Sequence, residues 1–338
     1  MNLRSQWFRM GTIVLGLACL ASSAAVADNN AEKAIRTQSE IARRVQGNLT
    51  IEGVPEIPAS LAERLSQYSN VRSASIADWD PQGRGLLVFT RFAQTAQIHR
   101  VAHPKSYREQ ITFFDEPVND IAVNPDSSKN EMALLKDVGG NENYQIFLWN
   151  LHDGRCKMLT DGKARYGSVV WNDEGSKIAY QSTQRDGSNW DIWIMDPKHP
   201  EQAKMVYGPG GYWSVMDWSK QGDKLLLYKY VSITDSSMVV LDLASGKIIP
   251  IGQDAEGTVA LGEVAKFAPN GEGVFFTTDN GSEFQRLAYQ NFSTGKVSYM
   301  AAEINADVVS LQLTKDGQFL AFVTNEDGFN RIYIMDLR

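Results

Sequence analysis

The sequence predicts an all-β protein, a β-propeller of about six four-stranded blades or an incomplete seven-bladed ring, preceded by a short helical lead-in. The first observation is a repeat: an apolar strand ends at a bulky residue about six times after residue 73. The second is regular spacing, since these bulky residues lie 44 to 49 positions apart. They are Trp79, Val123, Trp171, Trp218, Phe267 and Leu313. An open β-sandwich is the alternative, but sandwiches do not normally repeat a whole four-strand unit.

The third observation is the order of elements inside each copy. The first strand is followed by a turn rich in Asp, Asn, Pro and Gly, such as "NDEGSK" or "SKQGDK". Two apolar strands follow, and turns such as "LHDGR" or "LASGK" lead into a short fourth strand. Because several aromatic residues alternate with polar ones, we expect them to pack between blades and not to form a ligand cage. They are Trp79, Trp171, Trp193, Trp218 and Tyr333.

These patterns divide the chain into a signal peptide (residues 1–27), a lead-in (28–73) and a propeller (74–338). The predicted blades cover about 74–117, 118–166, 167–212, 213–257, 258–304 and 305–338. In the lead-in, apolar residues at helical spacing predict a helix over residues 31–46. A brief strand in "NLTIEG" and a second short helix after Pro58 follow.

The first residues have the features of a secretory signal. Arg4 and Arg9 precede the apolar run "GTIVLGLACLA", and "AVA" before Asp28 predicts cleavage after Ala27. A lipoprotein signal at Cys19 is a weaker match, and the apolar run is short for a transmembrane span. We therefore expect an exported protein, periplasmic or secreted, without a permanent membrane anchor.

Charge and cysteine content narrow the function classes. The formal charge is −7 and becomes more negative when Arg4 and Arg9 are removed, which argues against nucleic acid as a partner. After signal cleavage only Cys156 remains, so no internal disulfide can form. Cys156 has no neighbouring histidine, and we interpret it as an ordinary strand residue instead of a nucleophile.

No pattern in the chain predicts catalytic, cofactor-binding or metal-binding residues. The chain has no G-x-S-x-G elbow, and its four histidines, His99, His103, His152 and His199, show no metal-ligand spacing. Its paired carboxylates fall in turns, where acidic residues are common for conformational reasons. The loop "DVGGNENYQ" is flanked by strands and lacks the strand-to-helix setting of a nucleotide site.

The location of the loops is more informative than any single residue. In an up-and-down blade, loops between the second and third strands emerge at the same end as the links between blades. Exposed aromatic and arginine residues on such loops are typical of recognition surfaces, although packing of each one against its own hairpin is an equal alternative. The predicted recognition residues are Arg91, Asn143, Tyr144, Arg185, Trp190, Tyr212, Trp213, Glu283 and Asp327.

Several segments resemble the propeller of bacterial prolyl oligopeptidase family serine peptidases, of the dipeptidyl aminopeptidase and acylaminoacyl peptidase kind. They include "FTRFAQTAQIHRVAHP", "DVGGNENYQIF" and "YGPGGYWSVMDWSKQGDKLLL", and the later blades also resemble Tol-system propeller proteins. Family members carry the propeller in front of an α/β-hydrolase domain. The resemblance implies that the propeller restricts which peptides reach a catalytic serine in that domain.

Two functions follow. The first is the substrate-gating propeller of an exported serine peptidase, inactive without a hydrolase domain, which this chain lacks up to Arg338. The second is a non-catalytic periplasmic propeller that binds a protein or peptide, in the manner of the Tol propeller. A lyase or sugar-binding role has no supporting feature. A six-bladed ring would close if "NLTIEG" added an outer strand beside residues 332–337, whereas a seven-bladed ring would lack a blade.

Overall fold

The structure is a computed structural model and describes residues 43–338, apart from residues 82, 84 and 253–260. The predicted signal peptide therefore lies outside the described residues. The described residues fall into two compact units, one that ends at residue 71 and one that begins at residue 72.

The first unit contains a β-hairpin and a helix. Strand β1 (Arg43–Gln46) pairs antiparallel with β2 (Leu49–Glu52), and helix α2 (Ala59–Ser69) begins after Pro58. The strand in "NLTIEG" and the second helix were predicted correctly. The helix predicted over residues 31–46 was wrong at its end, because residues 43–46 form β1, while residues 31–42 lie outside the described part. Gly47, with a φ of 59°, starts the two-residue turn that joins the strands, a position that favours glycine.

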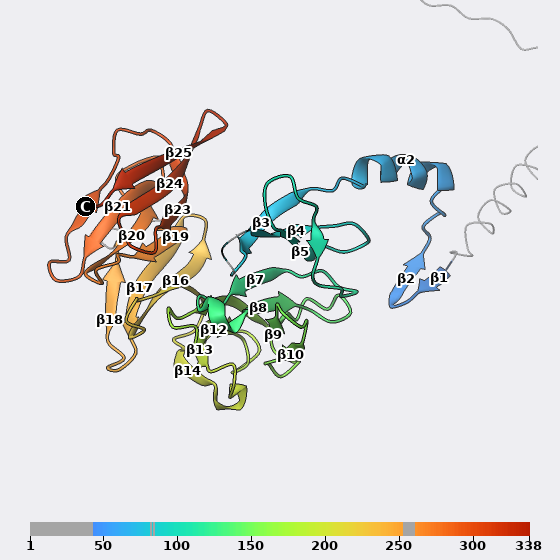
Figure 1. The fold of residues 1–338 in the computed structure, drawn as a ribbon, viewed down its shortest axis with the longest axis horizontal. Helices are drawn as coiled ribbons and strands as arrows, with labels where there is room; N and C mark the ends of the chain where they lie inside the picture. Colours follow the sequence, from blue (N-terminus) through green and yellow to red (C-terminus); the bar gives the residue numbers. More distant parts are fainter. Residues whose placement is uncertain (1–42, 82, 84, 253–260) are drawn as a thin grey trace, which may run out of the picture. The chain divides into compact units, whose positions relative to one another are not determined.

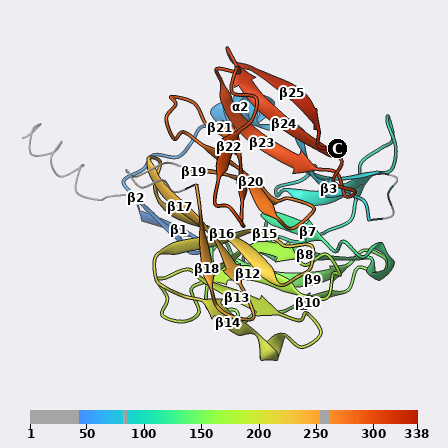
Figure 2. The ribbon, with the colours of Figure 1, turned by 90° about the vertical axis from the view of Figure 1, so that its left-hand side faces the viewer.

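The second unit is a β-propeller of six blades, as the repeat predicted. Blades one to five are four-stranded antiparallel sheets, and the sixth has three strands in the described residues. In Figures 1 and 2 the colour runs along successive blades, from the cyan first blade to the red sixth blade.

The strands occur in the same order in every blade. Blade one contains β3 (Ala74–Trp79), β4 (Leu86–Thr90), β5 (Gln97–Val101) and β6 (Glu109–Gln110). Blade two contains β7 (Asp120–Val123), β8 (Glu131–Lys136), β9 (Gln145–Asn150) and β10 (Cys156–Met158). Blade three contains β11 (Tyr166–Trp171), β12 (Ile178–Ser182), β13 (Asp191–Met195) and β14 (Lys204–Tyr207).

The remaining blades follow the same pattern. Blade four contains β15 (Tyr212–Trp218), β16 (Lys224–Ser232), β17 (Asp235–Asp242) and β18 (Ile248–Ile251). Blade five contains β19 (Leu261–Phe267), β20 (Gly273–Thr278), β21 (Arg286–Asn291) and β22 (Val297–Tyr299). Blade six contains β23 (Asp307–Leu313), β24 (Phe319–Glu326) and β25 (Phe329–Asp336). The strand in "NLTIEG" does not complete this last blade, because β2 pairs with β1.

Apolar clusters between successive blades hold the second unit together. In the described residues, five such clusters fill the five interfaces from blades one and two to blades five and six. The interface between blades three and four, for example, buries Ile192 against Leu225 and Leu227. Burial of such side chains is the main favourable term in folding, about 25 cal/mol per Å² of apolar surface.

The tryptophans that end the first strands show how an interface is built. Trp171 and Trp218 are 8% and 6% exposed. The indole N–H of Trp171 donates to the carbonyl of Ala122 (2.9 Å), and that of Trp218 donates to the carbonyl of Val170 (3.0 Å). Each ring thus packs on the preceding blade and satisfies its polar atom there.

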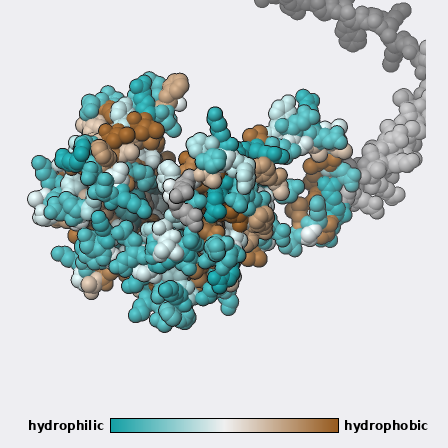
Figure 3. All heavy atoms as spheres, viewed as in Figure 1, coloured by the Kyte–Doolittle hydropathy of each residue, from teal (hydrophilic) through white to brown (hydrophobic). Residues whose placement is uncertain are grey.

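Trp79 occupies the same place in the repeat but is 70% exposed, so its predicted packing between blades was wrong. The difference has a structural reason: none of the five clusters covers the side of blade one that faces away from blade two. On blade six, Ile332 and Ile334 are also more than 70% exposed. Figure 3 shows hydrophobic side chains at the surface at the upper left, where β24 and β25 lie in Figure 1.

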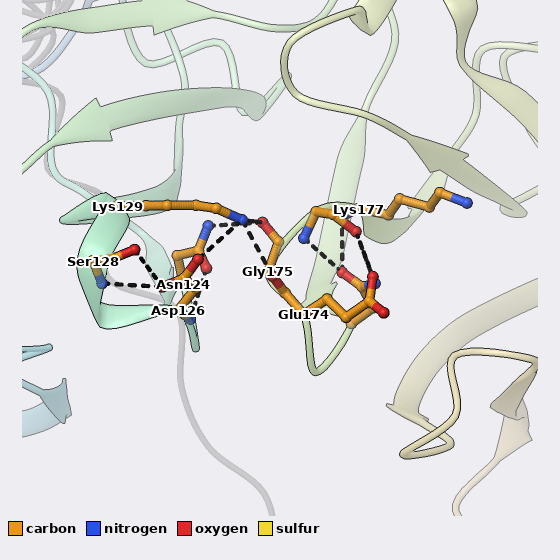
Figure 4. Close-up of polar contacts among 9 residues, drawn as sticks. Asn124, Asp126, Ser128, Lys129, Glu174, Gly175 and Lys177 are labelled. Carbon is orange, nitrogen blue, oxygen red and sulfur yellow. Dashed lines mark hydrogen bonds and ion pairs between the residues drawn. The ribbon is translucent and has the colours of Figure 1, made fainter.

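The turns after the first strands also lock neighbouring blades together (Figure 4). Lys129 donates from Nζ to the carbonyl of Gly175 (2.7 Å), and Asn124 donates from Nδ2 to the same oxygen (3.0 Å). Gly175 has a φ of 61°, and a Cβ atom there would lie 1.8 Å from Asn124 Oδ1. This contact explains why the turn of blade three requires glycine.

We predict that the three tryptophans differ in their contributions to stability. Trp171→Ala and Trp218→Ala should each lower the free energy of unfolding by about 3–5 kcal/mol, because they leave a cavity and an unpaired carbonyl. Trp79→Ala should change it by about 0.5 kcal/mol or less, as is typical of exposed positions. Urea unfolding monitored by circular dichroism measures all three, and an equal loss in Trp79→Ala would contradict the exposure of the Trp79 ring.

We predict that Gly175→Ala is more destabilising than Gly187→Ala. Both glycines have positive φ values, but a Cβ added at Gly187 would have no atom within 4 Å, whereas one added at Gly175 would meet Asn124. The strain of placing alanine at a positive φ is therefore common to both variants. The close contact should lower the free energy of unfolding of Gly175→Ala by about a further 1–3 kcal/mol. Thermal unfolding of the two variants side by side gives the comparison. Equal melting temperatures would show that Asn124 can move aside freely.

Candidate functional site

The two ends of the blades differ in the loops that they carry. The hairpins β4–β5, β8–β9, β12–β13, β16–β17, β20–β21 and β24–β25 lie at the same end as the links between blades, because adjacent strands are antiparallel. We call this end the hairpin face. The opposite end carries the turns between first and second strands and between third and fourth strands, and we call it the turn face.

Three predicted recognition residues meet on the hairpin of blade three and the link that follows it. Arg185 donates from Nε and from Nη2 to the two carboxylate oxygens of Asp191 (2.5 and 3.0 Å). Trp190 forms a parallel β-bridge with Tyr212, and their ring centroids are 5.5 Å apart. The Asp191 side chain is fully buried, and a bidentate pair of this kind has a fixed geometry. The hairpin is therefore held firmly against the link.

Trp213 lies inside the core and not on the surface, where the sequence analysis expected it. It is 5% exposed, and its ring packs edge-on against Tyr207 with centroids 4.9 Å apart. Its indole N–H donates to the carbonyl of Gly210 (2.9 Å). Strand alternation explains the difference, because adjacent residues of β15 point to opposite sides and only Tyr212 is directed outward.

The other predicted recognition residues are distributed over four blades. Asn143 accepts a hydrogen bond from Arg165 Nε (3.3 Å), and Tyr144 is partly buried against the cluster between blades two and three. Asp327 is exposed in the β24–β25 turn with a φ of 52°. Arg91 follows β4, and Glu283 lies in the β20–β21 hairpin. The structure does not gather these five residues into one site.

A pocket of about 710 Å³ opens on the hairpin face beside Tyr212. Most of its lining comes from blade four, with one residue each from blades three and five. The lining residues are Ser168, Tyr212, Ser214, Met216, Tyr228, Tyr230, Ile233 and Glu263. Of these, sequence reasoning identified only Tyr212 as a surface residue of interest. The signal for the others was the alternation in "YKY", which places Tyr228 and Tyr230 on the same side of β16.

Strand register brings the tyrosines together. Tyr212 pairs with Tyr230 across β15 and β16, and Ser214 pairs with Tyr228. The rings of Tyr212 and Tyr230 are 6.4 Å apart and nearly perpendicular, at 79°. Tyr228 is 5% exposed, and burial followed by the nearby negative charge of Glu263 raises its pKa, so its hydroxyl stays protonated. The pocket therefore presents two accessible rings above a buried third one.

The turn face has a pocket of its own near the inner strands. It has a volume of about 440 Å³ and is lined by residues that include Trp171, Asp217, Trp218 and Lys266. Lys266 Nζ lies 3.2 Å from Asp217 Oδ1, while burial raises the pKa of that carboxyl. Asp217 also accepts the backbone N–H of Phe267 (2.9 Å), so this acid joins blades four and five and its role is structural.

The described residues contain no group of three or more His, Cys, Asp or Glu side chains arranged to hold a metal ion. Cys156 is an exposed free thiol on β10. In the part of the chain that the structure describes, no helix is long and apolar enough to cross a membrane.

Comparison with known proteins identifies the fold. No protein-family model matches the chain, and no curated protein matches it. Solved structures do match. A TolB protein from Acinetobacter baumannii is 14% identical with a TM-score of 0.51, over 85% of this chain and 70% of that one. An oligogalacturonate lyase from Vibrio parahaemolyticus is 12% identical with a TM-score of 0.62, over 88% of this chain and 82% of that one.

A prolyl endopeptidase studied for the role of inter-domain dynamics in catalysis and specificity is 10% identical, with a TM-score of 0.61. The match covers 88% of this chain but only half of the endopeptidase. At these identities the matches establish the β-propeller fold alone. The resemblance to prolyl oligopeptidase and Tol propellers predicted the endopeptidase and TolB matches, but not the lyase match.

His99 is the one histidine with a buried ring among the described residues. It is 1% exposed, its Nδ1 lies 3.2 Å from the carbonyl of Gln97, and its ring lies 5.2 Å from that of Phe92. Its Nε2 is buried without a hydrogen-bond partner in the described residues. Burial lowers the pKa of this imidazole, so the folded protein holds it neutral.

We predict that His99 makes the protein less stable in mild acid. Because its pKa is lower in the folded state, the unfolded chain binds a proton first, and stability falls as the pH drops below about 6.5. His99→Asn keeps an N–H near Nδ1 but cannot titrate. The difference in unfolding free energy between wild type and variant, measured from pH 7.5 to 5, should therefore shift in favour of the variant. A difference independent of pH would contradict the prediction.

Proposed function

We propose that this propeller recognises peptides on its hairpin face, as the substrate-gating propeller of an exported serine peptidase of the prolyl oligopeptidase type. The observation that carries the proposal is the tyrosine pocket of about 710 Å³ next to the Trp190–Tyr212 contact. Pockets of this size that combine aromatic rings with a few polar groups are typical binding sites. In this proposal a hydrolase domain that acts with the propeller supplies the catalytic serine.

Rigid support makes this part of the hairpin face suitable for recognition. The backbone N–H of Gly211 donates to Asn189 Oδ1 (2.8 Å), and that of Trp190 donates to the carbonyl of Gly211 (2.9 Å). Together with the Arg185–Asp191 pair, these bonds fix the hairpin and the link as one body. A preorganised surface loses little conformational entropy on binding, so exposed aromatic rings there can serve as anchors.

The second candidate is a binding propeller that works without a peptidase, and its likeness in fold to the TolB structure supports it. Both candidates place the bound peptide or protein segment on the hairpin face. They differ in whether a catalytic domain takes part. Export is part of both, because the predicted cleavage after Ala27 gives a mature chain that begins at Asp28. The intact mass of the cellular protein checks this cleavage.

We predict that Trp190→Ala combined with Tyr212→Ala weakens peptide binding by about 30-fold or more, because even one large aromatic anchor at a hot spot contributes about 2 kcal/mol or more. The measurement is fluorescence binding to an array of acetylated, amidated pentapeptides. Tyr107→Ala is the matched control, since Tyr107 is 79% exposed and lies in the β5–β6 turn on the turn face. Equal binding by both variants would contradict a recognition role for the hairpin face.

A fluorophosphonate probe separates gating from catalysis. We expect no labelling of this chain, because the proposed function assigns the reactive serine to a partner domain. Labelling that is lost on substitution of one serine would overturn the proposal. Restored peptidase activity on mixing with a hydrolase domain would favour the gating candidate over the binding candidate.

A further inference from the structure

The tyrosine pocket has a charge of one sign. Among the described residues that line it, Glu263 is the one charged side chain, and no lysine or arginine belongs to the lining. Glu263 is exposed and forms no ion pair within the described part of the chain. A carboxylate with no internal partner at the rim of an aromatic pocket attracts a cation and repels an anion.

The tyrosine rings of the pocket also favour a cation. Tyr212 and Tyr230 are 42% and 37% exposed, and their planes stand at 79° to one another, so they form two walls of a corner. The faces of tyrosine rings carry partial negative charge, and a cation within about 6 Å of a ring centroid is attracted to it. Met216 and Ile233 add apolar surface, which suits the methylene stem of a long side chain.

Neighbouring charged groups do not cancel this effect. Lys229 is adjacent to both Tyr228 and Tyr230 in the sequence, but strand alternation directs it to the other side of β16, where its Nζ lies 5.8 Å from the Trp213 ring. The Ser236 hydroxyl is held by the backbone of Leu261, accepting from its N–H (2.7 Å) and donating to its carbonyl (2.9 Å). The carboxylate of Glu263 is thus the dominant charge at the pocket.

We propose that this pocket binds the basic side chain, lysine or arginine, of a peptide, with Glu263 pairing the charge and Tyr212 and Tyr230 flanking it. The inference rests on the proposed function, since it names the class of peptide that the hairpin face selects. The volume of about 710 Å³ exceeds the needs of a single ammonium group and accommodates a long side chain with adjacent backbone.

The test uses the full protein and three acetylated, amidated pentapeptides, Ala-Ala-X-Ala-Ala, with X as lysine, norleucine or glutamine. Isothermal titration should give a dissociation constant for the lysine peptide at least about tenfold below that of the other two. Glu263→Gln should raise the constant for the lysine peptide by about tenfold and leave that for the norleucine peptide unchanged. Tyr230→Leu should also weaken the lysine peptide more than the norleucine peptide.

Glu272→Gln is the matched control, because it removes one exposed charge from the same blade but in the turn between β19 and β20, on the turn face. It should leave all three constants unchanged. Equal affinities for the three peptides in the wild type would overturn the inference while leaving the proposed function standing. Failure of all three peptides to bind, in an array that also shows no binding, would overturn the proposed function as well.

One further peptide distinguishes a side chain from a peptide terminus. The norleucine peptide with a free amino group carries its cation at the backbone end. If it binds as tightly as the acetylated lysine peptide and loses that affinity in Glu263→Gln, the pocket takes an amino terminus and the inference is wrong. Weak binding of this peptide supports the assignment to a basic side chain.

Discussion

The structure depends on one interaction, the burial of the residue that ends each inner strand against the preceding blade. Trp171 and Trp218 show it fully, because each combines an apolar ring with an indole N–H that donates to a carbonyl of the neighbouring strand. In blades two and five the inner strand ends in Val123 and Phe267 instead of tryptophan. There the contact with the preceding blade includes an acid, because Asp78 accepts the backbone N–H of Val123 and Asp217 accepts that of Phe267. A propeller has no central core, so each blade is stabilised mainly by its two neighbours. The exposed Trp79 marks the one inner-strand tryptophan without such a neighbour in the described residues.

The packing of blade against blade also gives the turn face and the hairpin face different roles. On the turn face, glycines allow neighbouring turns to touch: a Cβ at Gly175 would meet Asn124, and a Cβ at Gly317 would lie 2.3 Å from Pro269. Close contacts of this kind leave little freedom for variation in length or composition. The hairpins lie beyond the packed parts of the strands and meet fewer such limits. Surface loops on a rigid scaffold are where binding residues usually occur, which agrees with the position of the tyrosine pocket.

The sequence was sufficient to predict the blades, but it was insufficient to predict which residues form the tyrosine pocket. The spacing from Val123 to Leu313 reports the periodic burial of bulky residues, and this local signal predicts a propeller. Trp79 has the same signal, but its burial depends on a neighbouring sheet, which no local pattern encodes. Trp213 and Tyr212 are adjacent in the chain, and only strand direction decides which one is buried. Tyr230 and Glu263 meet through register and blade packing, so their association requires three-dimensional structure. The helix predicted over residues 31–46 failed in its last four residues because a glycine turn outweighed the helical spacing.

The length of β16 explains why the pocket occurs at blade four. This strand has nine residues, whereas β12 in the preceding blade has five and β20 in the following blade has six. The core clusters use its first half, where Leu225, Leu226 and Leu227 are fully buried. In its second half Tyr230 is 37% exposed, and Ile233, in the turn that follows the strand, is 86% exposed. An extended strand keeps its hydrogen bonds to β15 and β17, and the protruding rings therefore retain a fixed orientation. Packing needs and recognition are thus met by successive parts of one strand, which allows the surface part to change while the core remains intact.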